Sequence, residues 1–128
     1  MVEKLRRKEM RLDLMAASER GDWAVVTAIA EREPMLLDGG DLDVIWRVAE
    51  AAAKTGPQAR ALDLYRSALG VAPGPEERLA TVRKAMAALG PDAVAPLLAE
   101  ERKGEFEPMR LDLARARIGE RLRPGGQG

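Results

Sequence analysis

The chain has 128 residues, and its 21 lysines and arginines are balanced by 21 aspartates and glutamates, so its formal net charge at pH 7 is zero. It contains no cysteine and no histidine, which excludes disulfides, thiolate nucleophiles and any catalysis or metal binding by imidazole. The balanced charge argues against a dedicated nucleic-acid-binding protein, because such proteins present a surface of predominantly positive charge.

The composition predicts an all-α protein. Alanine, leucine, arginine and glutamate dominate the sequence, and all four favour helices. Aromatic residues make up only 3% of the chain, and the clusters of β-branched residues that strands need are missing. No pair of titratable residues stands out as an active site, so we predict a protein that is not an enzyme and binds no cofactor or metal.

No stretch of the sequence reaches the ~18 apolar residues that a membrane-spanning helix requires. The first ten residues also lack the apolar core of a secretory signal. We therefore expect no membrane insertion and a cytoplasmic protein if residue 1 is the natural start, or a periplasmic one if the chain is an excised fragment. The basic run formed by Arg6, Arg7, Lys8 and Arg11 is interpreted as a solvated helix face in preference to a phosphate-binding or membrane-binding site.

Helical periodicity predicts a series of short helices. In chain order they cover approximately residues 3–20, 22–33, 41–55, 57–70, 75–89, 91–103 and 107–122. Residues 36–40 form the longest expected loop, and Asp41 is the expected N-cap of the next helix. Pro96 should kink or weaken its helix locally, and residues 124–128 are expected to form a flexible tail.

An internal repeat is the strongest signal in the sequence. Residues 21–29, 56–64 and 90–98 align without gaps, at separations of 35 and 34 residues. Each copy starts with a glycine, which can close a helix in the left-handed conformation, followed by Asp or Pro, which suit the start of the next helix. Each copy is therefore predicted to be the turn of a helix–turn–helix hairpin.

The segment 42–75 resembles a tetratricopeptide repeat. The residues that carry the resemblance are Ile45, Val48, Ala49, Gly56, Ala61, Tyr65, Ala68 and Pro73. The next repeat matches less well, and the first hairpin matches only through its turn and its length. The resemblance implies a single domain over residues 1–123: a right-handed α-solenoid of about three hairpins followed by a capping helix. The hairpins are expected over about 3–33, 41–70 and 75–103, and the cap over 107–122.

Proteins of this family bind another protein or a peptide along a concave face, which is lined by the first helix of each hairpin. Carried onto this chain, that face is lined by Lys8, Arg11, Met15, Glu19, Asp43, Trp46, Glu50, Lys54, Glu77, Lys84 and Ala87. The strongest candidates for partner binding are Arg11, Met15, Asp43, Trp46, Glu50, Lys54 and Lys84. The family branch that clamps a C-terminal carboxylate uses asparagines, and this chain has none, so that branch is disfavoured.

Three aromatic residues allow more than one interpretation. Trp46 either anchors a partner in the groove, as tryptophan does in many interfaces, or packs as core between adjacent hairpins. Tyr65 occupies a packing position of the family and is expected in the core. Trp23 is expected to be partly buried against a neighbouring hairpin and not to stack on a ligand.

A different function remains open. The helix over 107–122 has no partner helix in the chain, although stacked repeats need a cover for the last apolar face. The chain can therefore also be a structural unit that assembles through its end hairpins into homo-oligomers. Residues 108–115 also resemble segments of long repeat proteins associated with exopolysaccharide export. The resemblance implies, as an alternative, a fragment of a larger repeat protein, for example of an exopolysaccharide export or secretion system.

Overall fold

The computed structural model describes residues 2–122, and this part of the chain is entirely helical, without a β-strand. The predicted all-α class is therefore confirmed. The helices are α1 (Val2–Glu19), α2 (Trp23–Arg32), α3 (Met35–Asp38), α4 (Leu42–Thr55), α5 (Gln58–Val71), α6 (Pro75–Leu89), α7 (Ala95–Leu98) and α8 (Glu107–Leu122). The flexible tail predicted for residues 124–128 lies outside the described residues.

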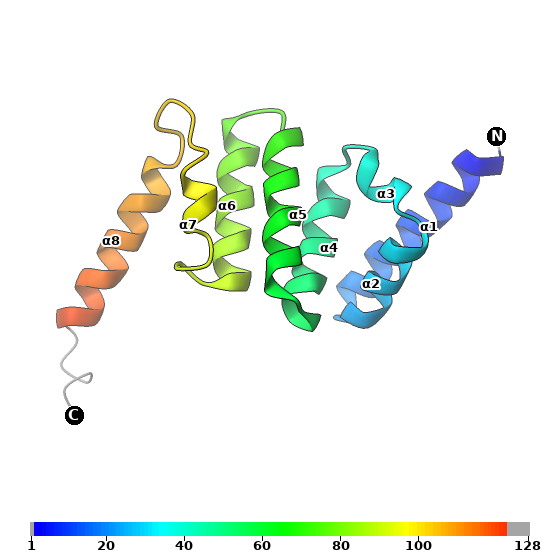
Figure 1. Ribbon diagram of the computed structural model, residues 1–128, viewed down its shortest axis with the longest axis horizontal. Helices are drawn as coiled ribbons and strands as arrows, with labels where there is room; N and C mark the ends of the chain where they lie inside the picture. The colour runs from blue at the N-terminus through cyan, green and yellow to red at the C-terminus, as the bar shows by residue number, and fades with distance from the viewer. Residues whose placement is uncertain (1, 123–128) are drawn as a thin grey trace.

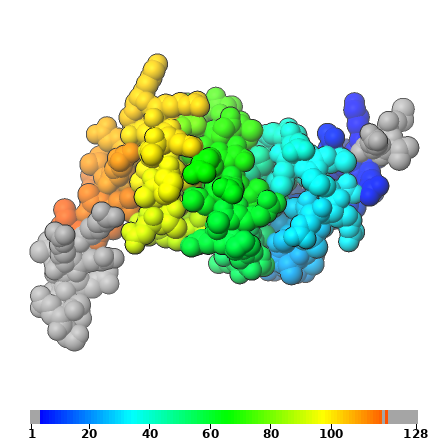
Figure 2. Space-filling view, viewed as in Figure 1, coloured from blue at the N-terminus to red at the C-terminus, as the bar shows by residue number. Residues whose placement is uncertain are grey.

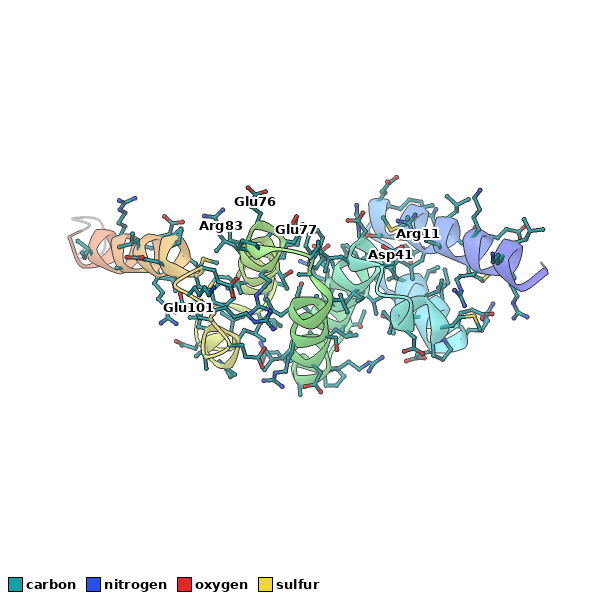
Figure 3. The ribbon with its side chains drawn as sticks, turned by 90° about the horizontal axis from the view of Figure 1, so that it is seen from above. Arg11, Asp41, Glu76, Glu77, Arg83 and Glu101 are labelled. Atoms are coloured by element: carbon teal, nitrogen blue, oxygen red, sulfur yellow. The ribbon has the colours of Figure 1, made fainter. Side chains whose placement is uncertain are left out.

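The helices follow one another along the long axis of the molecule, with α1 and α8 at opposite ends (Figure 1). We call this arrangement the row. Seen from above, the helices fall into two layers: α1, α4, α6 and α8 form one layer, and α2, α5 and α7 form the other (Figure 3). The second layer covers the face that is turned towards the viewer in Figure 2. Helix α4 contacts α1 and α6 in its own layer and α2 and α5 in the other, so it is the centre of the fold.

Glycines follow the long helices α1, α4 and α6 at the predicted turns. Gly21, Gly56 and Gly90 have φ angles of 72°, 77° and 89°, a region that residues with a side chain rarely occupy. The amide of Gly56 donates to the carbonyl of Ala52 at 2.7 Å, so the turn also satisfies a carbonyl at the end of α4. Asp41 caps the start of the same helix, because its side chain accepts a hydrogen bond from the amide of Val44.

The core of the central hairpin is built from one apolar stripe on each of its two helices. All of their members are buried: Ile45, Val48, Ala49 and Ala52 on α4, and Ala61, Leu64, Tyr65, Ala68 and Leu69 on α5. Alanines at the points of contact let the two helices approach closely, and this close approach buries the larger side chains around them. The central hairpin therefore follows the pattern that the sequence predicts.

The prediction of a helix over 91–103 is wrong. The structure contains only the four-residue α7 in this stretch, so the third hairpin lacks a full second helix. Pro96 accounts for the missing helix before α7: with residues 91–94 helical, its ring would clash with the preceding turn and one hydrogen bond would be lost. Proline does not explain why α7 ends at Leu98. Within the first turn of α7 a proline is tolerated, because the first backbone N–H groups of a helix have no carbonyl partner inside the helix.

Two further regions differ from expectation. The predicted loop over 36–40 is partly helical, because α3 covers its first half and buries Leu36 against the core.

At the C-terminal end, α8 is held mainly near its start, where Phe106 and Met109 are buried. Further along α8, Leu111 is 50% exposed and Ile118 is 55% exposed, so these apolar side chains face solvent.

Candidate functional site

A groove runs between α4 and α6, with α5 beneath it. Its volume is about 400 Å³, and we call it the α4–α6 groove. It is lined by Asp43, Trp46, Arg47, Glu50, Lys54, Tyr65, Lys84, Ala87 and Ala88. The residues from α4 are spaced three and four positions apart, which places them on one face of the helix. On the α6 side the lining includes Ala87 and Ala88, whose small side chains leave space in the groove.

The structure brings five of the seven candidate partner-binding residues together in this groove. They are Asp43, Trp46, Glu50, Lys54 and Lys84. Ala87, which the family pattern also places on the binding face, lines the same groove. The positions carried over from the family thus converge on one surface in the centre of the row.

Trp46 links the two helices of the groove. Its indole N–H donates to the hydroxyl of Thr81 on α6 at 2.9 Å, and that hydroxyl donates in turn to the carbonyl of Glu77 at 2.8 Å. The side chain is half-buried and one side of it lines the groove. The two interpretations of Trp46 are therefore not exclusive: the residue packs between hairpins and also faces the groove.

The face of the Trp46 ring already holds a positive charge. The ammonium of Lys84 lies 4.7 Å from the ring centroid, within the range of a cation–π interaction. Because Lys84 is exposed, this contact contributes only about 0.5–1 kcal/mol. A stronger cationic ligand can therefore displace it at small cost.

Tyr65 forms part of the floor of the groove. The residue is 1% exposed, which confirms that it belongs to the core, yet it also lines the groove. Burial raises the pKa of its hydroxyl strongly above the usual value, and the nearby negative charge of Glu50 raises this pKa further. The phenol therefore stays protonated, and can donate a hydrogen bond, throughout the physiological pH range.

The charges in the groove are only partly neutralised within the protein. Neither Asp43 nor Glu50 takes part in the ion pairs between described residues. Arg47, which the sequence analysis did not select, donates to the hydroxyl of Ser18 on α1 at 3.1 Å. Two carboxylates without an ion-pair partner among the described residues thus lie on the α4 side of the groove.

Arg11 and Met15 do not line the α4–α6 groove. Arg11 donates to the carboxylate of Asp41 at 2.5 Å, and this hydrogen bond raises the pKa of the guanidinium above its ordinary value. The labelled pair lies between α1 and the start of α4 in Figure 3. Met15 is half-buried and packs against the core. Both side chains are therefore engaged in contacts within the protein, and these contacts help to hold α1 in the fold.

A buried polar cluster near the C-terminal end was not predicted from the sequence. Arg78 on α6 is 4% exposed and its guanidinium donates to the carboxylate of Glu105 at 2.7 Å. It also donates to the backbone carbonyls of Leu69 and Glu100 at 2.9 and 2.8 Å, and lies 5.7 Å from the ring centroid of Phe106. Each of the three guanidinium nitrogens donates a hydrogen bond within the protein, and the cluster thereby fastens the segment between α7 and α8 to α6.

The signal for this cluster is weak in the sequence. Arg78 occupies an inward-facing position of α6 where the helical pattern calls for an apolar residue, and Phe106 is the only phenylalanine of the chain. A buried arginine needs partners from loops whose path the sequence does not reveal. Only the structure shows that the cluster is a structural element.

Other kinds of site are not apparent in residues 2–122. No group of three or more acidic side chains among them is arranged to hold a metal ion. None of the described helices combines the length and apolar character needed to cross a membrane. Comparison of the chain with protein-family models, with curated proteins and with solved structures found no match.

Proposed function

We propose that this protein is a non-catalytic interaction module that binds a protein or peptide partner in the α4–α6 groove. The observation that carries the proposal is the groove itself: four residues of one face of α4 and Lys84 of α6 line it together, and one wall is the ring of Trp46. A half-buried tryptophan beside unpaired charges is typical of an interface anchor, because it offers a large contact area and loses little conformational entropy on binding.

The proposal includes a tetratricopeptide-like architecture for the whole row. The repeat spacing of 35 and 34 residues, the positive φ angles of the three turn glycines and the two-layer arrangement of helices all support it. In that architecture the groove belongs to the layer formed by the first helices of successive hairpins. A right-handed superhelix would place this layer on the concave side.

The proposal is tested by closing the groove. In Ala87→Trp, a large ring replaces an exposed methyl group on the α6 wall, so it fills the groove without disturbing the core. Ala59→Trp is the matched control, because Ala59 is exposed on α5 and does not line the groove. Affinity capture from the source organism, compared by quantitative mass spectrometry, should yield a partner that binds the wild type and Ala59→Trp but not Ala87→Trp. Partners that bind all three proteins equally would refute the proposal.

A second function is favoured by the ends of the row. The outward face of α1 exposes Leu5 by 59% and Leu12 by 57%, and that of α8 exposes Leu111 and Ile118. Contact between such faces would stack one copy on the next, as end repeats without a polar cap do. Light scattering at high micromolar concentration distinguishes the two functions: a strict monomer excludes stacking, and a concentration-dependent increase in mass that Leu12→Lys abolishes supports it.

A further inference from the structure

The α4 wall of the groove presents an indole between two carboxylates. Asp43, Trp46 and Glu50 follow one another at spacings of three and four residues, so their side chains share one face of the helix. We propose that this strip binds an arginine side chain from the partner, whose guanidinium stacks on Trp46 in place of Lys84 and pairs with Glu50. The proposal rests on the function proposed above and specifies the chemistry of the partner.

The position of Lys84 is the first argument for a cationic ligand. Its ammonium lies 4.7 Å from the centroid of the Trp46 ring, which shows that this ring face is open to a cation. A guanidinium is planar and less strongly hydrated than an ammonium, so it stacks better on an indole. Lys84 is exposed and takes part in none of the ion pairs between described residues, so it can move into solvent when an arginine enters.

The carboxylate of Glu50, which has no ion-pair partner among the described residues, is the second argument. Glu50 is half-buried, close enough to Tyr65 to affect its ionisation, and has no cationic partner among the described residues. A carboxylate in that position gains from an incoming guanidinium, which can donate two parallel hydrogen bonds to it. Arg47, the cation nearest in sequence to Trp46, donates instead to Ser18 on α1. The groove as a whole is also lined by the cations Lys54 and Lys84, so the place that suits an added cation is the part formed by Trp46 and Glu50.

Short peptides test the inference directly. The probes are five-residue peptides with blocked ends and a central arginine, citrulline or glutamate, so that only the central side chain differs. Binding is followed by NMR through the indole N–H signal of Trp46 in a Trp23→Phe background, where it is the only tryptophan signal because the chain has two tryptophans. We expect the arginine peptide to shift this signal and the citrulline and glutamate peptides to leave it unchanged.

Two substitutions give effects of opposite sign. Lys84→Ala should tighten binding of the arginine peptide by about threefold, because it removes a competing charge from the ring face. Glu50→Gln should weaken binding by about fivefold or more, because the guanidinium loses its charged acceptor. Arg83→Ala is the control for Lys84→Ala: it removes an exposed positive charge one residue away, outside the groove.

Weaker binding in Lys84→Ala, equal binding of the citrulline peptide, or preferential binding of the glutamate peptide would overturn the inference. Absence of any shift with the arginine peptide at millimolar concentration would overturn it as well. The capture experiment with Ala87→Trp is independent of these results. A partner lost on closing the groove, together with no arginine binding, leaves the proposed function standing and removes only the arginine.

Discussion

The central hairpin and the stretch from Gly90 to the start of α8 begin with the same local signal and end differently. Gly56 and Gly90 both have positive φ angles and a proline directly after them. After Gly56 the chain forms the 14-residue α5, whereas after Gly90 it forms turns and the four-residue α7. The glycine therefore determines where a helix ends, and the residues that follow determine whether another can form.

The two regions are also held together in different ways. The two helices of the central hairpin pack against each other through apolar side chains, many of them alanines. These side chains recur at helical spacing along both helices. The C-terminal stretch has no long second helix to supply such a contact. It is fastened instead by the hydrogen bonds and ion pair of Arg78 and by the buried ring of Phe106. Polar contacts thus replace helix packing where the helix is interrupted.

The largest expected effect comes from removing the guanidinium of Arg78. Arg78→Met keeps the length of the side chain, but it leaves the carboxylate of Glu105, only 7% exposed, without its cation. Loss of one partner from a buried ion pair costs about 3–5 kcal/mol. We expect the free energy of unfolding, measured in urea, to fall by that amount.

Arg83→Met is the matched control, because it makes the same chemical change on the same helix. Arg83 forms an exposed ion pair with Asp112 at 3.7 Å, in which both side chains are more than half exposed. Such pairs contribute little, so the change in unfolding free energy should stay within about 0.5 kcal/mol. If both substitutions had equally small effects, the polar cluster would not be what holds the C-terminal stretch.

The contrast between the regions also explains how much of the fold was predictable. Helix propensity, periodicity and turn glycines are local properties, and they were sufficient to place α4, α5 and α6 within about one residue of their observed ends. The helix expected over 91–103 is reduced to α7, and Pro96 accounts for the part that is missing before Ala95. The path of the chain after α7 depends on contacts between residues far apart in sequence, such as Arg78 and Glu105, and no local pattern encodes them.

The candidate site divides in the same way. The groove residues on α4 were predicted from the pattern of residues 42–75, and Lys84 was predicted from the weaker pattern that follows it; both helices are regular. Arg11 and Met15 were assigned by the same rule to the first hairpin, where the resemblance is limited to turn and length. There, the ion pair of Arg11 with Asp41 and the packing of Met15 engage both side chains internally. Such pairings depend on how α1 lies against α4, which sequence spacing does not specify.

The next effect concerns the hydrogen bond that joins the two walls of the groove. Thr81→Val removes the acceptor of the Trp46 indole N–H and should lower the free energy of unfolding by about 1–2 kcal/mol. Thr27→Val makes the same change on α2, where the threonine hydroxyl is buried and has no hydrogen-bond partner among the described residues. It should leave stability unchanged or increase it slightly. Equal losses in the two variants would show that side-chain shape, not the hydrogen bond, matters at Thr81.

A smaller effect appears at alkaline pH. The unfolded chain ionises its tyrosine near pH 10, whereas the folded protein keeps Tyr65 neutral to a higher pH. Above pH 10 the unfolded state therefore binds fewer protons than the folded state, and stability falls as pH rises. Between pH 10 and 11 we expect a loss of about 1 kcal/mol in the wild type relative to Tyr65→Phe.

Absorbance at 295 nm measures the ionisation directly, because Tyr65 is the only tyrosine of the chain. The tyrosinate signal should appear in native protein only at the pH where the protein unfolds. A titration near pH 10 without unfolding would mean that the floor of the groove is open to solvent, and the central hairpin would then be less tightly closed than its apolar contacts indicate.

The smallest effect tests the cause of the difference between the two regions. Pro96→Ala restores an amide that can donate to the preceding turn, so α7 should extend towards Gly90 by about one helical turn, seen as increased helical circular dichroism. Stability should change by less than about 1 kcal/mol, because proline is tolerated in a first turn. Pro75→Ala is the control: Pro73 and Gly74 precede α6, so that helix should not lengthen. An unchanged α7 would instead assign its shortness to the fully buried Val94 and Leu97, whose packing would then hold the turns in place.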